Sequence, residues 1–156
     1  MQQILKSKII LPDWRFKNPK KEEFDKLCAS IKVNGQTKNI TVRNLNNGMY
    51  EVVDGRSVFE AILASKKEID YIWCYVYRDV SKLESMLLYL QQDFCFESDY
   101  IDISKAIKEI NFKCSKLHIS KFTKYSYNEI VELIRLADYD FAKFKVKDSD
   151  QQKNFF

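Results

Sequence analysis

Four short stretches in the first half of the chain have the apolar pattern of β-strands. Residues 2–10 carry isoleucines among polar residues, and residues 39–44 alternate between apolar and polar side chains. Residues 49–53 come directly after a turn signal, Asn46-Asn47-Gly48, which predicts a hairpin between them and the preceding strand. Residues 69–77 are apolar on both faces, and this pattern predicts a central strand.

Helical spacing occurs twice in the same half. Residues 20–33 place apolar side chains at i, i+3, i+4 and i+7, which predicts an amphipathic helix with one stripe facing a core. Asn34 and Gly35 follow, and glycine tolerates the left-handed conformation in which many helices end. A second short apolar stripe predicts a helix over residues 57–65.

The second half of the chain shows helical spacing only. Ser81 and Glu84 have the spacing of a capping box in front of an apolar stripe that extends to Leu90. Asp102 is expected to cap the next helix, and Ser126–Ala137 has the pattern of another. We find no clear short turn leading into a helix with exposed polar residues that could read bases.

A change in pattern near residue 95 divides the chain. Residues 1–95 combine strands and helices, residues 96–145 are predicted to form a helical extension packed on them, and residues 146–156 a frayed polar tail. We expect an aromatic patch near the end of the extension to cover the core, namely Tyr139, Phe141 and Phe144.

Composition limits the class of protein. With 156 residues, 46% hydrophobic and 31% charged, the chain can form a compact core. No apolar run reaches the about 20 residues that cross a bilayer, and the four cysteines form no CxxC pair, so we expect a cytoplasmic protein without a membrane partner. Cys114 and His118 stand four residues apart, but two ligands do not make a metal site, so none is predicted.

The net charge of +4 is mild, but some lysines are clustered. A group in the second half is a candidate for contacts with a nucleic-acid backbone, and the alternative is a solvated surface. The group consists of Lys113, Lys116, Lys121 and Lys124.

The most informative segment lies where a predicted strand ends at Asp54 and a helix begins almost at once. The first N–H groups of a helix have no partner within it, and the helix dipole favours an anion there. Gly55 would let a ligand approach the backbone, Arg56 offers a guanidinium and Ser57 a hydroxyl. These features predict a phosphate site. The alternative is an ordinary turn in which Asp54 caps the helix.

The order of motifs resembles the N-terminal domain of ParB partition proteins and the wider ParB/sulfiredoxin superfamily. The resemblance covers about residues 1–95 and runs through Ser30-Ile31, Gly35, Ile40-Thr41-Val42-Arg43 and Tyr50-Glu51-Val52-Val53-Asp54-Gly55. It implies an α+β fold, with a small, mostly antiparallel sheet flanked by helices and followed by a helical C-terminal part.

The resemblance also implies a ligand. In this superfamily the site holds nucleotide phosphates, which predicts CTP or ATP with Mg²⁺ as cofactor. The phosphate-binding residues would be Gly55, Arg56 and Ser57. The residues near the nucleotide would be Gly35, Gln36, Thr37 and Arg43.

The chain departs from the family in the phosphate segment, where Ser57 and Val58 replace further basic residues and the sulfiredoxin cysteine is missing. We therefore expect a ParB-like nucleotide-binding module that acts in DNA partition or regulation on a plasmid, phage or other mobile element. One alternative is a phosphotransferase, NTPase or nuclease of the same fold, for which Asp54 and Glu60 are the catalytic candidates. Another is a degenerate domain that binds a protein partner. A homodimer is left open.

Overall fold

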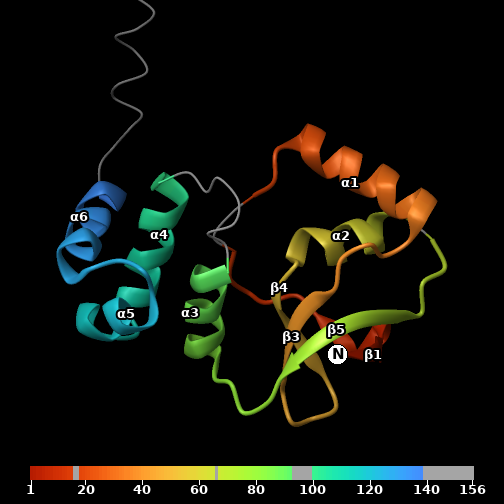
Figure 1. Ribbon diagram of the computed structural model, residues 1–156, viewed down its shortest axis with the longest axis horizontal. Helices are drawn as coiled ribbons and strands as arrows, with labels where there is room; N and C mark the ends of the chain where they lie inside the picture. The colour runs from red at the N-terminus through yellow and green to blue at the C-terminus, as the bar shows by residue number, and fades with distance from the viewer. Residues whose placement is uncertain (16–17, 66, 93–99, 139–156) are drawn as a thin grey trace, which may run out of the picture.

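A computed structural model describes residues 1–15, 18–65, 67–92 and 100–138. The predicted boundary at residue 95, the aromatic patch at 139–144 and the tail at 146–156 lie outside the described residues. The described part has an α+β fold in which one sheet and its helices lie beside a group of helices (Figure 1).

The strands form one five-stranded mixed sheet. In spatial order these are β1 (Gln2–Leu5), β5 (Tyr71–Tyr77), β3 (Ile40–Asn44), β4 (Tyr50–Asp54) and β2 (Ile9–Ile10). The pairs β1–β5 and β3–β4 are antiparallel, and the pairs β5–β3 and β4–β2 are parallel. The predicted hairpin is therefore the β3–β4 pair in the middle of the sheet.

The single strand predicted over residues 2–10 is wrong. A turn of 3₁₀ helix, η1 (Lys6–Lys8), separates β1 from β2, and the two strands lie at opposite edges of the sheet. The N–H of Lys6 donates to the carbonyl of Asp70 beside β5, which ends the pairing of β1 at that point. The isoleucine pattern did not reveal this break, because Ile4 and Ile9 are buried in the same core.

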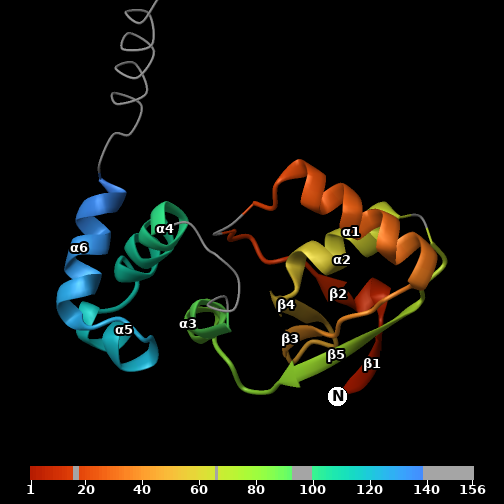
Figure 2. The same ribbon diagram turned by 45° about the horizontal axis from the view of Figure 1, so that its top comes forward.

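Two helices cover one face of the sheet: α1 (Lys21–Asn34) and α2 (Arg56–Ala64). Figure 2 shows both on the same side of the strands. Their apolar stripes and the inward residues of the strands form one core. Its buried members are Ile4, Ile9, Ile31, Ile40, Val42, Val52, Phe59, Ala61, Ile62, Ile72 and Cys74.

The other face of β5 is open. Tyr71, Trp73 and Tyr75 point away from the core and are exposed, while Ile72 and Cys74 between them are buried. The predicted central strand is confirmed, because β5 lies between β1 and β3 in the sheet, but only one of its faces is buried. Exposed and buried aromatic residues are equally apolar in the sequence, so the pattern did not show which face of β5 is exposed.

The second group of helices begins before the predicted boundary. It comprises α3 (Lys82–Gln92), α4 (Tyr100–Asn111), α5 (Lys116–Phe122) and α6 (Tyr127–Ala137). Figure 2 shows α3 end-on between the sheet and the other three helices. The core of this group includes Trp14 from the loop after β2, together with Met86, Leu87, Leu90, Ile103, Ala106, Ile107, Ile110, Ile119, Tyr125, Ile130 and Leu133.

Capping explains where most of these helices begin. The predicted box of Ser81 and Glu84 is present, with the N–H of Ser81 donating to Glu84 Oε2 at 2.8 Å. Ser126 and Glu129 form a second box at the start of α6. The predicted cap at Asp102 is wrong, because the helix already includes Tyr100 and the carboxylate lies in its first turn.

Helix α5 was missed because it has only seven residues and a single inward side chain, Ile119. Its N-cap is Ser115, whose side chain accepts the N–H of His118. Four residues, 112–115, join α4 to α5, so the short turn that the sequence did not reveal is present. Among the residues described, no helix is long and apolar enough to cross a bilayer.

Candidate functional site

A cavity of ≈ 390 Å³ lies at the N-terminal end of α2, where the phosphate site was predicted. The loop after β2, the helix α1, the end of β4 and the residue Tyr89 of α3 all contribute to its wall. Five predicted site residues line it, namely Thr37, Asp54, Gly55, Arg56 and Ser57. Pro12, Trp14, Arg15, Pro19, Glu23, Phe24, Leu27, Lys38, Asn39, Val52, Val53, Val58 and Tyr89 complete the lining.

The backbone at the start of α2 presents donors to this cavity. Gly55 is the N-cap, and the first intrahelical bond is donated by the N–H of Phe59 to its carbonyl at 3.0 Å. The N–H groups of Arg56, Ser57 and Val58 therefore have no acceptor within the helix. The N-cap position is occupied by Gly55, which has no side chain, and Asp54 precedes it as the last residue of β4.

Gly55 also allows a close contact between α2 and the sheet. Its φ of 81° and ψ of 22° are left-handed, and a Cβ on it would meet Ile40 Cγ2 at 2.8 Å and Ile40 Cα at 3.2 Å. The missing side chain therefore lets α2 pack closely on the start of β3. Its contribution to the site is to hold the helix N-terminus beside the sheet.

The guanidinium of Arg56 is engaged by the protein itself. Its Nη1 donates to the carbonyls of Trp14 at 2.7 Å and Pro12 at 3.1 Å, and its Nε donates to Glu60 Oε1 at 3.0 Å. Arg56 thus lines the cavity and also ties the loop after β2 to α2. A phosphate in the cavity would meet a guanidinium that already has three hydrogen bonds.

Glu60, the other catalytic candidate, is bound by two arginines. It accepts two bonds from Arg15, at 3.1 and 2.9 Å, in addition to the bond from Arg56. Such bidentate pairing fixes both guanidiniums beside the cavity. Because its carboxylate accepts bonds from both arginines, Glu60 is a positioning group in this geometry.

Arg15 was not found by sequence analysis, although it lines the cavity. It stands in an irregular loop, where no periodic pattern marks a residue that contacts α2 far along the chain. The pair of Arg15 with Glu60 spans 45 positions. This ion pair is recognised only in the folded structure, where the loop lies beside α2.

The loop after α1 has two different uses. Thr37 lines the cavity, whereas Gln36 binds the edge of β5: its amide donates to the Trp73 carbonyl at 2.9 Å and accepts the Trp73 N–H at 2.8 Å. Gly35 ends α1 with a φ of 76°. Gly35 and Gln36 are outside the cavity lining and shape the loop that carries Thr37.

Arg43 lies apart from the cavity. Its Nε donates to Glu51 Oε2 at 2.8 Å and its Nη1 donates to the Val80 carbonyl at 3.2 Å. Both side chains of this ion pair are about nine-tenths buried, at 12% and 10% exposed. The pair joins β3 and β4 to the segment before α3.

Of the two catalytic candidates, Asp54 alone lines the cavity. In the part of the chain that the structure describes, no three His, Cys, Asp or Glu side chains gather in a way that could hold a metal ion. The arrangement is suited to binding an anion.

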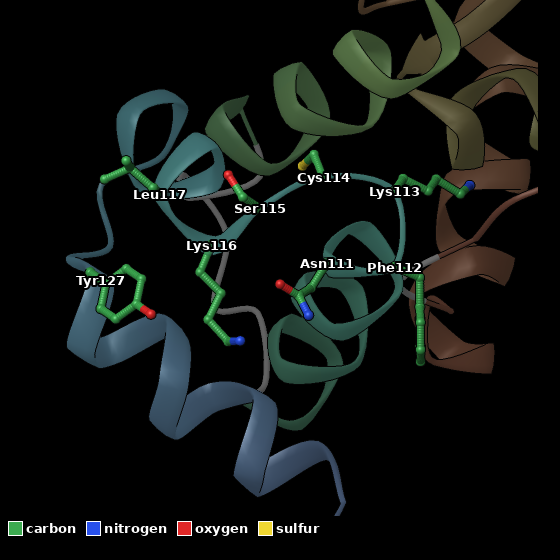
Figure 3. A pocket seen from close by; sticks show the side chains of 8 residues that line it. All are labelled: Asn111, Phe112, Lys113, Cys114, Ser115, Lys116, Leu117 and Tyr127. Atoms are coloured by element: carbon green, nitrogen blue, oxygen red, sulfur yellow. The ribbon is translucent and has the colours of Figure 1, made fainter.

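The predicted lysine cluster lies at the far end of the molecule, around α5. Lys113 and Lys116 border a shallow hollow of ≈ 630 Å³, together with Asn111, Phe112, Cys114, Ser115, Leu117 and Tyr127 (Figure 3). The ammonium of Lys113 lies 3.9 Å from Glu109. Lys121 is exposed on α5, and the Lys124 ammonium lies 5.6 Å from the centre of the Tyr125 ring.

Comparisons with known proteins give a fold and no closer relationship. No family model matches the sequence, and no curated protein matches it. The structure is similar to the C-terminally truncated chromosome-partitioning protein ParB from Caulobacter crescentus complexed with CTP-gamma-S, with a TM-score of 0.52 and 15% identity over 98% of this chain and 87% of that one.

It is also similar to the same truncated ParB complexed to the centromeric parS site. Here the TM-score is 0.57 and the identity 15%, over 90% of this chain and 73% of that one. The fold of this chain is therefore ParB-like, as the resemblance in the sequence predicted. At this identity the likeness concerns the fold alone.

Proposed function

We propose that the protein is a ParB-like nucleotide-binding module that acts on DNA in partition or regulation. The observation that carries the proposal is the ≈ 390 Å³ cavity in which the N-terminal donors of α2, the Ser57 hydroxyl and two arginines occur together. Phosphate oxygens bind well to such a set, because the helix dipole and the guanidiniums act in the same direction.

The cavity also fits the rest of a nucleotide. Phe24 and Leu27 of α1 give it an apolar wall opposite the donors, and Tyr89 adds an aromatic ring. A base or ribose can bury its apolar surface there while the phosphates face α2. Asp54 also lines the cavity, and a carboxylate is the kind of ligand that a Mg²⁺ ion carried by the nucleotide prefers. The similar ParB structure with CTP-gamma-S makes CTP the first ligand to test.

Action on DNA is supported by a separate observation. The lysines around α5 are outside the lining of the cavity, on a group of helices with a short turn between α4 and α5. The similar ParB complexed to parS makes a duplex the natural reference ligand.

Thermal unfolding with CTP, ATP and GTP, each with Mg²⁺, tests the nucleotide site. A ligand at a hundred times its Kd adds about 2.7 kcal/mol to the stability of the native state, and for a domain of this size that raises Tm by about 5–10 °C. No shift with any nucleotide would contradict the proposal and favour a domain that binds a protein partner. Release of phosphate from the bound nucleotide, lost in Asp54→Asn, would favour the enzyme of the same fold.

Ser57→Asp is a sharper variant than Arg56→Ala, which would also release the loop after β2. A carboxylate in the first turn of α2 favours the helix dipole but repels a phosphate. We therefore expect an unchanged or higher Tm without ligand and no shift with nucleotide. Ser57→Asn, which adds no charge, is the matched control and should keep most of the shift.

A further inference from the structure

The excess positive charge of the chain is concentrated in residues 110–128. This segment contains four lysines and no Asp or Glu. The whole chain has 26 basic and 22 acidic residues, so removing these four lysines leaves 22 of each. The rest of the molecule is therefore formally neutral, and an anionic partner is attracted to the end that carries α5.

Exposed aromatic rings occur in the same segment. Phe112 is 80% exposed, Tyr127 50% and Phe122 44%, and the aliphatic Leu117 is 56% exposed. Single exposed apolar residues are common on protein surfaces, but here Phe112, Leu117 and Tyr127 line one hollow. Figure 3 shows Lys116 between Tyr127 on one side and Asn111 on the other, with Phe112 beyond Asn111.

We propose that this α5 surface, made of Phe112, Lys116, Leu117, Lys121 and Tyr127, binds single-stranded nucleic acid. Unpaired bases stack on Phe112 and Tyr127, and the lysines pair with the phosphates between them. Aromatic rings interleaved with cations are the usual means of holding an unpaired strand without reading its sequence. The inference deepens the nucleic-acid part of the proposed function and does not need a nucleotide at α2.

The residues of α5 favour a single strand over a duplex. Side chains that read base edges in a major groove are mainly Arg, Lys, Asn and Gln, and of these α5 (Lys116–Phe122) contains only Lys116 and Lys121. Its outward positions carry Leu117 and Lys121, and His118 stacks on Phe122 with 4.7 Å between ring centres. Rings of this kind have no base faces to contact in an intact duplex, because the bases there are already stacked.

The test uses the full chain and a fluorescein-labelled 20-nucleotide single strand, with a duplex of the same sequence, in fluorescence anisotropy. We expect the single strand to bind more tightly than the duplex at low salt. The double variant Phe112→Ala/Tyr127→Ala should weaken single-strand binding about tenfold or more. Phe112→Leu, which keeps an apolar side chain without a ring face, should lose most of the Phe112 contribution.

Lysine variants provide a second readout. The slope of log K against log salt is negative, and each phosphate contact that is lost reduces its magnitude by about 0.7 for a single strand. Lys116→Gln and Lys121→Gln should therefore each make the slope less negative by roughly that amount. Exposed positions away from the surface are matched controls: Tyr75→Ala on β5 for the rings and Lys32→Gln on α1 for the charges. Both controls should bind as the unchanged protein does.

Three results would overturn the inference. They are no single-strand binding at low salt, duplex binding that is tighter and unaffected by Phe112→Ala/Tyr127→Ala, or tighter binding to phosphatidylserine vesicles than to the strand. The nucleotide-induced change in Tm is measured on the same variants. It should be unchanged, so a failure at the α5 surface is distinguished from a failure at the α2 cavity.

Discussion

At the scale of single residues, two glycines with the same backbone angle have different surroundings. Gly48 and Gly55 both have a φ of 81°, but a Cβ on Gly48 would have no atom within 4 Å, whereas one on Gly55 would meet Ile40. The backbone strain of an alanine is therefore alike at both positions, and only Gly55 adds a collision with β3.

We expect Gly48→Ala to cost about 1 kcal/mol of unfolding free energy and Gly55→Ala about 2–4 kcal/mol. Urea unfolding of both variants measures the two costs. The difference between them isolates the contact with Ile40. Equal costs would mean that α2 can move away from β3 without loss.

Cys74 predicts a dependence of stability on alkaline pH. Its thiol is fully buried in β5, and burial raises its pKa from 9.0 to about 12. The unfolded chain therefore loses this proton above pH 9 while the folded chain retains it, so the contribution to stability is present below pH 9 and is lost as the pH rises towards 12. Relative to Cys74→Ala, the unfolding free energy should fall by about 1.4 kcal/mol per pH unit in this window.

Urea midpoints of the two proteins at pH 8, 10 and 11 measure this effect. Other groups that titrate in the same range are common to both proteins and cancel in the comparison. A constant difference across the three pH values would show that the Cys74 thiol ionises in the folded state as easily as in the unfolded one.

At the scale of elements, the ends of α5 and α6 offer another comparison. Ser126 at α6 belongs to a complete capping box with Glu129, whereas Ser115 at α5 accepts a single N–H. Ser126→Ala should cost about 1 kcal/mol. Ser115→Ala should cost less, because only one bond is lost and α5 has seven residues against eleven in α6.

The α6 box also has an acid-dependent part. Bonds from the hydroxyl and the N–H of Ser126 hold the pKa of Glu129 below its usual 4.5. The stability from these bonds is present above pH 4.5 and is lost as the pH falls through the folded pKa. The Tm difference between the unchanged protein and Ser126→Ala should therefore be smaller at pH 3 than at pH 7.

Elements with a complete local pattern were predicted well from the sequence. The helix α1, the β3–β4 hairpin and the Ser81 box each have their apolar spacing and their end signal within a few residues. Residues 2–10 and α5 were not predicted, because the edge at which a short strand pairs and the burial of Ile119 depend on distant parts of the chain. The exposure of Tyr71, Trp73 and Tyr75 depends on whether another element packs on that face of β5, and no local sequence pattern indicates this.

At the scale of the whole molecule, four consecutive residues connect its two cores. Pro12 and Trp14 accept bonds from Arg56, Asp13 pairs with Lys82 at the start of α3, and Arg15 pairs with Glu60. The Trp14 ring then enters the helical core, 5.5 Å from Tyr89 in an edge-to-face contact. The loop 12–15 thus joins β2, α2 and α3.

Trp14→Ala should cost about 3–5 kcal/mol, because it empties a large site in the helical core. Trp73→Ala is the matched control: its ring is 42% exposed, against 6% for Trp14, so its loss should cost well below half as much. Urea unfolding followed by circular dichroism compares them. Similar costs for both variants would contradict the role of Trp14 as a core residue.

The candidate site shows the same limit of sequence reasoning. The helix start at Gly55-Arg56-Ser57 and Thr37 could be found because they belong to local motifs, and all of them line the cavity. The contacts of Arg56 with Pro12 and Trp14 span more than 40 positions, and so does the pair of Arg15 with Glu60. Such contacts exist only in the folded chain, and they decide which guanidinium is available to a ligand.

The loop 12–15 also determines how the chain can be divided. A fragment that begins at α3 contains all four helices of the second group. It would nevertheless lack the Trp14 indole that fills its core, and a cavity would be left beside Tyr89. A synthetic peptide carrying the first twenty residues would supply that indole from outside. The two pieces would then be expected to associate, with the indole of the peptide filling the vacant site in the core of the helical fragment.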